Sequence, residues 1–166
     1  MDTKKKTWTR RYTEEKREYG EKTFSRRLRR LTQIIYGVIN MKEFLYKELS
    51  YEIIGLAMEV HRELGTGFLE KVYENALMIL FEEKNLKSRQ QEPIKINFRN
   101  KIIGDYIADI IVEDKIILEL KCTSKIIEIH KAQIANYLKA TGKKVGIIIN
   151  FGNKSLEIER VVMQNL

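Results

Sequence analysis

The chain has 166 residues, of which 43% are hydrophobic and 33% are charged. This length suits one domain, and the composition is that of a globular protein. No run approaches the roughly 18 consecutive apolar residues of a membrane-spanning helix, which excludes an integral membrane protein. One cysteine and two histidines cannot supply a Cys/His zinc cage or an internal disulfide. We therefore expect a reducing compartment, the cytoplasm.

The net charge of +8 is concentrated near the N-terminus. Residues 1–40 hold 12 basic and 5 acidic residues, leaving 19 and 18 from the chain totals of 31 and 23. This segment is predicted to be a basic, flexible extension with one short amphipathic helix from Leu28 to Val38. A solvated tail, a nucleic-acid or targeting arm, and a stretch upstream of a natural start at Met41 all stay open. Residues 41–166 are predicted to form the single domain.

Two amphipathic helices begin the predicted domain. Apolar residues recur at helical spacing over residues 51–64, and the pattern stops at Gly65-Thr66-Gly67. A second helical pattern covers residues 68–81 and fades in the polar stretch 82–91. Pro93, the single proline, then opens extended structure.

The rest of the chain is predicted as five strands and one helix. The strands cover residues 94–99, 102–112, 116–121, 145–150 and 156–163. Asn100-Lys101 supplies the first turn. The helix covers residues 126–140, with Thr123 or Ser124 as its N-cap and Gly142 at its end. The order of two helices, three strands, a helix and two strands favours an α/β fold with a mixed sheet and flanking helices.

Charged residues interrupt two of the apolar strands. Asp109 lies in one strand, and Glu119 and Lys121 lie in the next. Because side chains alternate along a strand, Glu119 and Lys121 point to the same face. A two-residue loop between the strands would set Asp109 opposite Leu118. A three-residue loop sets Asp109 opposite Glu119, and it is favoured because the apolar faces then coincide.

Two facing carboxylates require a cationic neighbour. At about 4 Å and an effective dielectric constant near 20, their repulsion is of order 4 kcal/mol. Lys121 relieves part of it. The carboxylates of Asp109 and Glu119, with the Leu120 carbonyl, are the hard oxygen ligands that Mg²⁺ or Mn²⁺ prefers. A catalytic metal site and a structural ion-pair cluster both remain open on this pattern.

The motifs resemble those of a known nuclease superfamily. Asp109, then Glu119-Leu120-Lys121, then Gln133 with Tyr137 resemble the D…ExK…QxxxY arrangement of RecB-like nucleases in the PD-(D/E)XK superfamily. The stretch 67–73, GFLEKVY, also resembles the signature of the GxxExxY proteins, a prokaryotic group assigned to that superfamily. The resemblance implies a restriction-endonuclease-like αβββαβ core, with a mixed central sheet flanked by helices.

The resemblance also implies a metal-dependent nuclease. Asp109, Glu119 and the Leu120 carbonyl would bind one or two Mg²⁺ or Mn²⁺ ions, and Lys121 would position or deprotonate the attacking water. The partner would be nucleic acid, with DNA ahead of RNA. The competing class is a nucleic-acid-binding or regulatory module that keeps the fold without turnover, because a fold alone does not fix a function.

Helix residues are expected to complete the site. By the same resemblance, a helix carboxylate joins the metal ligands, with Glu74 preferred to Glu70. Glu59 and His61 rank lower, because a lone histidine beside an apolar stripe is more often packed than metal-bound.

Gln133 and Tyr137 lie one turn apart on the later helix, with His130 on the same side. By resemblance, Gln133 and Tyr137 would contact the substrate phosphate or steady the strand of Lys121. An ordinary amphipathic helix edge is the other interpretation.

Overall fold

The computed structural model describes residues 45–163. The predicted N-terminal extension, its helix and Met41 lie outside these residues. The described elements, in chain order, are α3 (Lys47–Leu64), α4 (Glu70–Glu83), β1 (Ser88–Phe98), β2 (Lys101–Val112), β3 (Ile116–Lys121), α5 (Glu128–Thr141), β4 (Val145–Asn150) and β5 (Glu157–Val162). This order of helices and strands is the predicted one.

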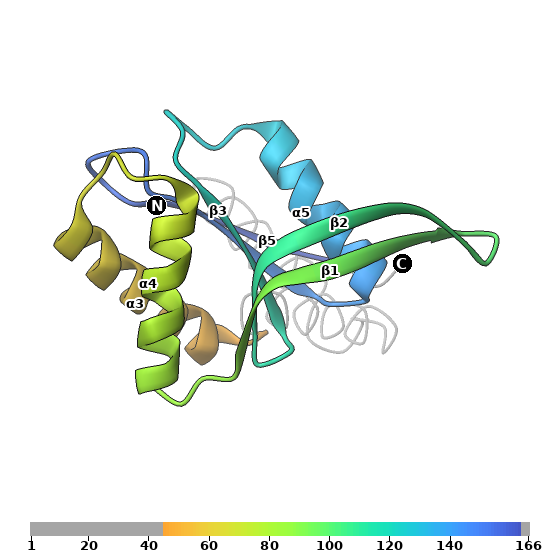
Figure 1. The fold of residues 1–166 in the computed structure, drawn as a ribbon, viewed down its shortest axis with the longest axis horizontal. Helices are drawn as coiled ribbons and strands as arrows, with labels where there is room; N and C mark the ends of the chain where they lie inside the picture. Colours follow the sequence, from red (N-terminus) through yellow and green to blue (C-terminus); the bar gives the residue numbers. More distant parts are fainter. Residues whose placement is uncertain (1–44, 164–166) are drawn as a thin grey trace, which may run out of the picture. The chain divides into compact units, whose positions relative to one another are not determined.

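The five strands form one mixed sheet in the order β1-β2-β3-β4-β5. Strands β3 and β4 pair in parallel, and the other neighbours pair antiparallel. Helices α3 and α4 lie to one side of the sheet and α5 to the other (Figure 1). The alternation within β3 produces this layering, since Leu118 and Leu120 pack with α3 and α4 whereas Ile117 packs with α5. The predicted α/β architecture with a mixed sheet and flanking helices is confirmed.

Three local features differ from the prediction: the start of β1, the position of the first hairpin turn and the N-cap of α5. Strand β1 begins at Ser88, five residues before Pro93, because its polar residues alternate with half-buried ones at the sheet edge. The first turn lies at Arg99 and Asn100, whose φ angles are 47° and 63°, and not at Asn100-Lys101. Left-handed conformations at both central residues are those of the tight hairpin turn that matches strand twist.

The predicted N-cap of α5 was also wrong. The N-cap residue is Ile127, and its N–H donates to His130 Nδ1 at 3.3 Å. Thr123 lies in the preceding loop, where its hydroxyl donates to the Lys125 carbonyl. Thr123 is thus bound within the loop, and neither Thr123 nor Ser124 is the N-cap of the helix.

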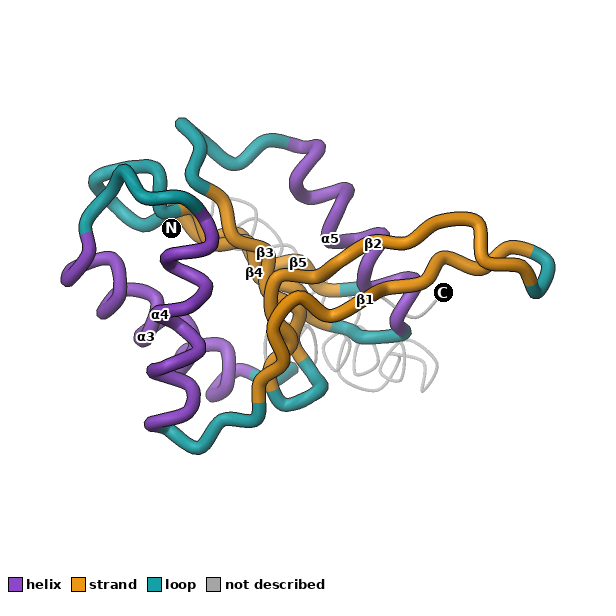
Figure 2. The backbone as a smooth tube through the Cα atoms, viewed as in Figure 1, coloured by secondary structure: helices purple, strands orange, loops and turns teal. Residues whose placement is uncertain are grey.

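The register between β2 and β3 positions the site. Three pairs join these strands, from Val112 opposite Ile116 to Ile110 opposite Leu118. The three-residue loop of the sequence argument is confirmed. Pairing of β2 with β3 stops at Ile110, whereas β1 and β2 continue together as a hairpin that leaves the sheet (Figure 2). We call the point where β2 separates from β3 the fork.

Within residues 45–163, no helix has both the length and the apolar character needed to cross a bilayer.

Candidate active site

Asp109 is the first residue of β2 beyond the fork. Its Oδ2 accepts a hydrogen bond of 2.7 Å from the Leu120 N–H on β3. The side chain therefore occupies the position of a strand partner, which is why the regular pairs end at Ile110 and Leu118. The N–H and the C=O of one strand residue point to the same neighbouring strand. The Leu120 carbonyl consequently faces the fork as well.

Glu119 is nearly enclosed, with 3% of its surface exposed. Its Oε1 accepts hydrogen bonds from Lys121 Nζ at 2.6 Å and from Gln133 Nε2 at 2.7 Å. Gln133 Nε2 also donates to the Tyr137 hydroxyl at 2.7 Å. The other oxygen, Oε2, is buried and receives no hydrogen bond from any described residue. A buried carboxylate oxygen without a partner is costly, so this atom needs an explanation.

The electrostatics of the fork favour a cation. Burial raises the pKa of the Glu119 carboxyl to about 7, and the charge of Asp109 acts in the same direction against the bonds from Lys121 and Gln133. Burial also raises the pKa of Asp109, and the nearby charges of Glu74 and Glu70 add to this increase. Lys121 therefore compensates only part of the negative charge that gathers here.

Both candidate carboxylates of α4 lie near enough to Asp109 to influence it, but they have different partners. Glu74 is 2% exposed and accepts from Gln91 Nε2 through both oxygens, each at 2.9 Å, and from Lys71 Nζ at 3.2 Å. Glu70 Oε1 accepts the Cys122 N–H at 3.0 Å, directly after Lys121. Glu70 thus fixes the backbone directly after the end of β3.

The lower-ranked candidates lie elsewhere. His61 Nε2 is 2.8 Å from the Asn153 carbonyl, and its ring lies 6.1 Å from the Phe151 ring. Glu59 is half-buried on α3.

His130, the third polar residue of the α5 edge, accepts the N–H of Ile127 at the start of that helix. The structure therefore brings Gln133 and Tyr137 to Glu119, but it packs His61 against the loop after β4.

Gln91 is a site residue that the sequence argument missed. It lies between the pairs Gln90–Ile110 and Glu92–Ala108, in the position that faces Asp109, and its φ of 53° is left-handed. A non-glycine residue in this conformation is uncommon and often marks a functional site. The only sequence signal was its position two residues before Pro93, at the end of the polar stretch 82–91 in which the second helical pattern fades.

Asn150 was also missed, although it organises the loop after Lys121. Its side chain is fully buried at the end of β4. Its amide donates to the Thr123 carbonyl at 2.9 Å and to Glu157 Oε2 at 3.0 Å, and it accepts the N–H groups of Thr123 and Gly152 at 3.0 Å each. A Cβ at Gly152 would lie 2.3 Å from the Thr123 carbonyl oxygen, so only glycine fits there.

A divalent cation fits the donors at the fork. No group of three or more His, Cys, Asp and Glu side chains within residues 45–163 has the arrangement of a metal site. The compatible set is smaller: the carboxylates of Asp109 and Glu119 and the carbonyl of Leu120. All are hard oxygen donors, and Glu119 contributes an oxygen that no other group uses.

A mixed sheet that carries an aspartate and a Glu-x-Lys strand at such a fork has the restriction-endonuclease-like architecture. A family model described as the PD-(D/E)XK nuclease superfamily matches residues 47–161, and the chain belongs to this superfamily. The predicted superfamily is therefore confirmed, whereas the narrower GxxExxY assignment stays a prediction.

Two solved structures show similarity at low identity. The crystal structure of SSO0001 has 20% identity and a TM-score of 0.45, over 73% of this chain and 59% of that one. This chain thus spans less than two thirds of the length of SSO0001. The alkaline exonuclease LHK-Exo from Laribacter hongkongensis has 14% identity and a TM-score of 0.37, over 69% of each chain. A search of curated proteins finds no match.

Proposed function

We propose that this domain is a divalent-metal-dependent nuclease that hydrolyses phosphodiester bonds in nucleic acid, with DNA as the preferred substrate. The observation that carries the proposal is Glu119, a carboxylate with 3% exposure whose Oε2 has no partner among the described residues. Asp109 and the Leu120 carbonyl supply the neighbouring oxygens. Superfamily membership supports the same reaction class.

Asp109, Glu119 and the Leu120 carbonyl would hold the cation. When bound, Mg²⁺ or Mn²⁺ would lower the pKa of a coordinated water and offset the charge that develops on the phosphate oxygens. Gln133 and Lys121 both donate to Glu119 Oε1, which fixes the carboxylate and leaves Oε2 for the ion. This arrangement makes Gln133 a positioning residue, and Tyr137 holds Gln133 in turn.

Lys121 would act on the attacking water. Its Nζ lies 2.6 Å from Glu119 Oε1, and its side chain is 18% exposed, compared with 3% for Glu119, so Lys121 is the more solvent-accessible partner of this ion pair. In this position Nζ would orient a water molecule and hold a proton near the reacting phosphate. The hydrogen bond to Glu119 keeps Nζ directed to this position.

We propose that Glu74 adds negative charge beside the cation without completing a group of three carboxylate ligands, and that Glu70 has a positioning role. Gln91 donates to both oxygens of Glu74, which orients that carboxylate beside Asp109. Glu70 is committed to the Cys122 N–H and thereby fixes the backbone that follows Lys121.

The test is a cleavage screen on double-stranded DNA, single-stranded DNA and RNA, with Mg²⁺, Mn²⁺ or EDTA. Lys121→Ala and Asp109→Asn should each reduce cleavage by about 10²–10⁴-fold. The matched control for Lys121→Ala is Lys139→Ala, which removes an exposed lysine from the last turn of α5. Binding without cleavage under every metal condition would instead support the non-catalytic module, and cleavage of RNA alone would refute the preference for DNA.

A further inference from the structure

The outer part of the β1–β2 hairpin has no sheet neighbour beyond its own two strands among the described residues. We call residues 93–107 the distal ribbon. Its strands pair from Pro93 opposite Ile107 to Phe98 opposite Lys101, entirely beyond the last pair of β2 with β3. Figures 1 and 2 show it extending away from the rest of the sheet. Its root contacts α5 through Tyr106, whose ring lies 5.8 Å from that of Tyr137.

The distal ribbon exposes an unusual amount of apolar surface. Its exposed large apolar residues are Phe98 at 58%, Ile102 at 53%, Ile103 at 64%, Tyr106 at 51% and Ile107 at 54%. Single exposed apolar residues are ordinary, but five within fifteen residues, on two strands that no third strand joins among the described residues, indicate a binding surface.

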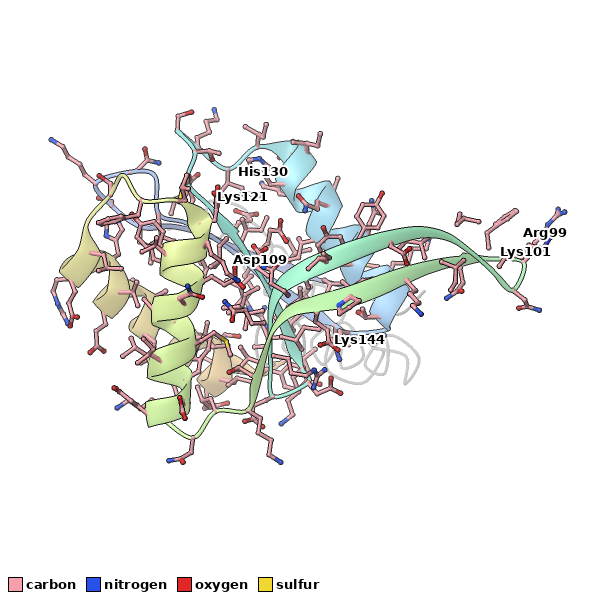
Figure 3. All side chains as sticks on the ribbon, in the orientation of Figure 1. Arg99, Lys101, Asp109, Lys121, His130 and Lys144 are labelled. Atoms are coloured by element: carbon pink, nitrogen blue, oxygen red, sulfur yellow. The ribbon has the colours of Figure 1, made fainter. Side chains whose placement is uncertain are left out.

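The tip of the distal ribbon is basic. Arg99 lies in the turn and Lys101 directly follows it. The Arg99 guanidinium lies 5.3 Å from the centre of the Phe98 ring. Lys95 adds a third positive charge, and the one acidic residue, Asp105, is the strand partner of Lys95. Figure 3 shows Arg99 and Lys101 at the far end of the hairpin from Asp109. The distal ribbon thus carries a net charge of +2, whereas all of residues 41–166 carry only +1.

We propose that the distal ribbon binds in a groove of double-stranded DNA, with Arg99 and Lys101 on the phosphates and Phe98 against a base step. This inference rests on the proposed nuclease function and names its substrate form. A two-stranded ribbon fits the major groove of B-form DNA, and ribbons that bind the minor groove combine arginine with apolar wedges. The narrow major groove of double-stranded RNA does not admit side chains in this way.

The geometry connects the distal ribbon to the active site. Asp109 and Lys101 lie eight residues apart on the single strand β2, which corresponds to roughly 26 Å at about 3.3 Å per residue. At about 3.4 Å per base pair, this length spans roughly eight base pairs. A duplex held by the tip of the distal ribbon therefore has its backbone within reach of the fork.

The experiment measures binding of the full chain to a fluorescein-labelled DNA duplex by anisotropy, in EDTA and at several salt concentrations. Arg99→Ala/Lys101→Ala should raise Kd at least about tenfold and should reduce the magnitude of the salt slope by about 1.8, since each phosphate contact contributes about 0.9. The matched control is Arg62→Ala/Lys84→Ala, which removes the same two residue types from exposed positions near the ends of α3 and α4. Any contribution of residues 1–40 is common to both variants.

A second variant tests the apolar contact. Phe98→Ala should raise Kd for the duplex but leave the salt slope unchanged, because it removes no charge. Its side chain is more than half exposed, so the fold does not depend on it.

Three results would overturn the inference about the distal ribbon. The first is equal Kd values and slopes for the double variant and its control. The second is equal losses of affinity for single-stranded and double-stranded DNA. The third is a double variant that differs from the wild type in oligomeric state, measured by sedimentation, but has the same DNA affinity. The partner of the distal ribbon would then be a second copy of this chain. If the double variant binds DNA more weakly than the wild type, but the wild type cleaves no substrate, the proposed nuclease function is refuted. The proposed contact between the distal ribbon and the duplex is then still supported.

Discussion

Replacing Glu119 with glutamine should remove a pH-dependent cost from the metal-free protein. Burial and Asp109 raise the pKa of Glu119 from 4.5 to about 7 in the folded state. Between these pH values the folded protein keeps a proton that the unfolded chain has lost. Because the folded state then binds more protons, its free energy of unfolding falls as the pH rises through this window.

The magnitude follows from the size of the pKa change. At 1.36 kcal/mol for each pH unit, the interval between 4.5 and about 7 corresponds to a loss of about 3 kcal/mol. The loss is complete just above pH 7, where Glu119 is ionised in both states. Asp109 has a raised pKa as well and adds a loss of the same sign, so Glu119→Gln should flatten the dependence without abolishing it.

Urea denaturation in EDTA at pH values from 4.5 to 8.5 measures this effect. The control is Glu128→Gln, whose carboxylate is 90% exposed in a pair with Lys131 and should leave the pH dependence unchanged. If the free energy of unfolding depends on pH in the same way in the wild type and in Glu119→Gln, the pKa of Glu119 is not raised by burial. A cation at the fork would then not be needed to compensate this carboxylate.

Three further predictions concern the metal, the loop and the extension. Mg²⁺ should raise the Tm of the wild type by mass action, and Asp109→Asn should remove that gain; equal gains in differential scanning fluorimetry would contradict the metal site. Asn150→Ala should lower the free energy of unfolding by about 3 kcal/mol in urea denaturation, because partly buried groups such as the Thr123 N–H and C=O lose their bonds, and a change below about 1 kcal/mol would be inconsistent with this network. Removal of residues 1–40 should leave metal-dependent cleavage intact, and loss of the folded domain on truncation, seen by circular dichroism, would refute the proposed division of the chain.

The sequence was sufficient for the features that depend on alternation and apolar pairing. Matching the apolar faces of β2 and β3 selected the three-residue loop, and that choice set Ile111 opposite Ile117 as the structure has them. The same alternation put Glu119 and Lys121 on one face, where they form an ion pair at 2.6 Å. These features depend on burial, which repeats along the chain and is therefore visible in the pattern of residues.

Features that depend on single polar contacts could not be predicted in this way. Gln91 reaches Glu74 from 17 residues away, and Asn150 reaches Thr123 from 27 residues away. Such pairings become visible only when the tertiary fold brings the partners together. The mistaken Thr123 cap has the same origin, since the local sequence favoured a cap while the fold used this residue in the loop after β3.

The bond from the Leu120 N–H to Asp109 gives this protein an internal reporter of its own site. In a regular sheet that amide would donate to a neighbouring carbonyl, but here its acceptor is a titratable carboxylate, and Leu120 is 1% exposed. The amide ¹H and ¹⁵N chemical shifts of one residue should therefore follow protonation of Asp109 and occupancy of the fork. Occupancy of the fork by different cations can then be compared by NMR spectroscopy, without a substrate and without turnover.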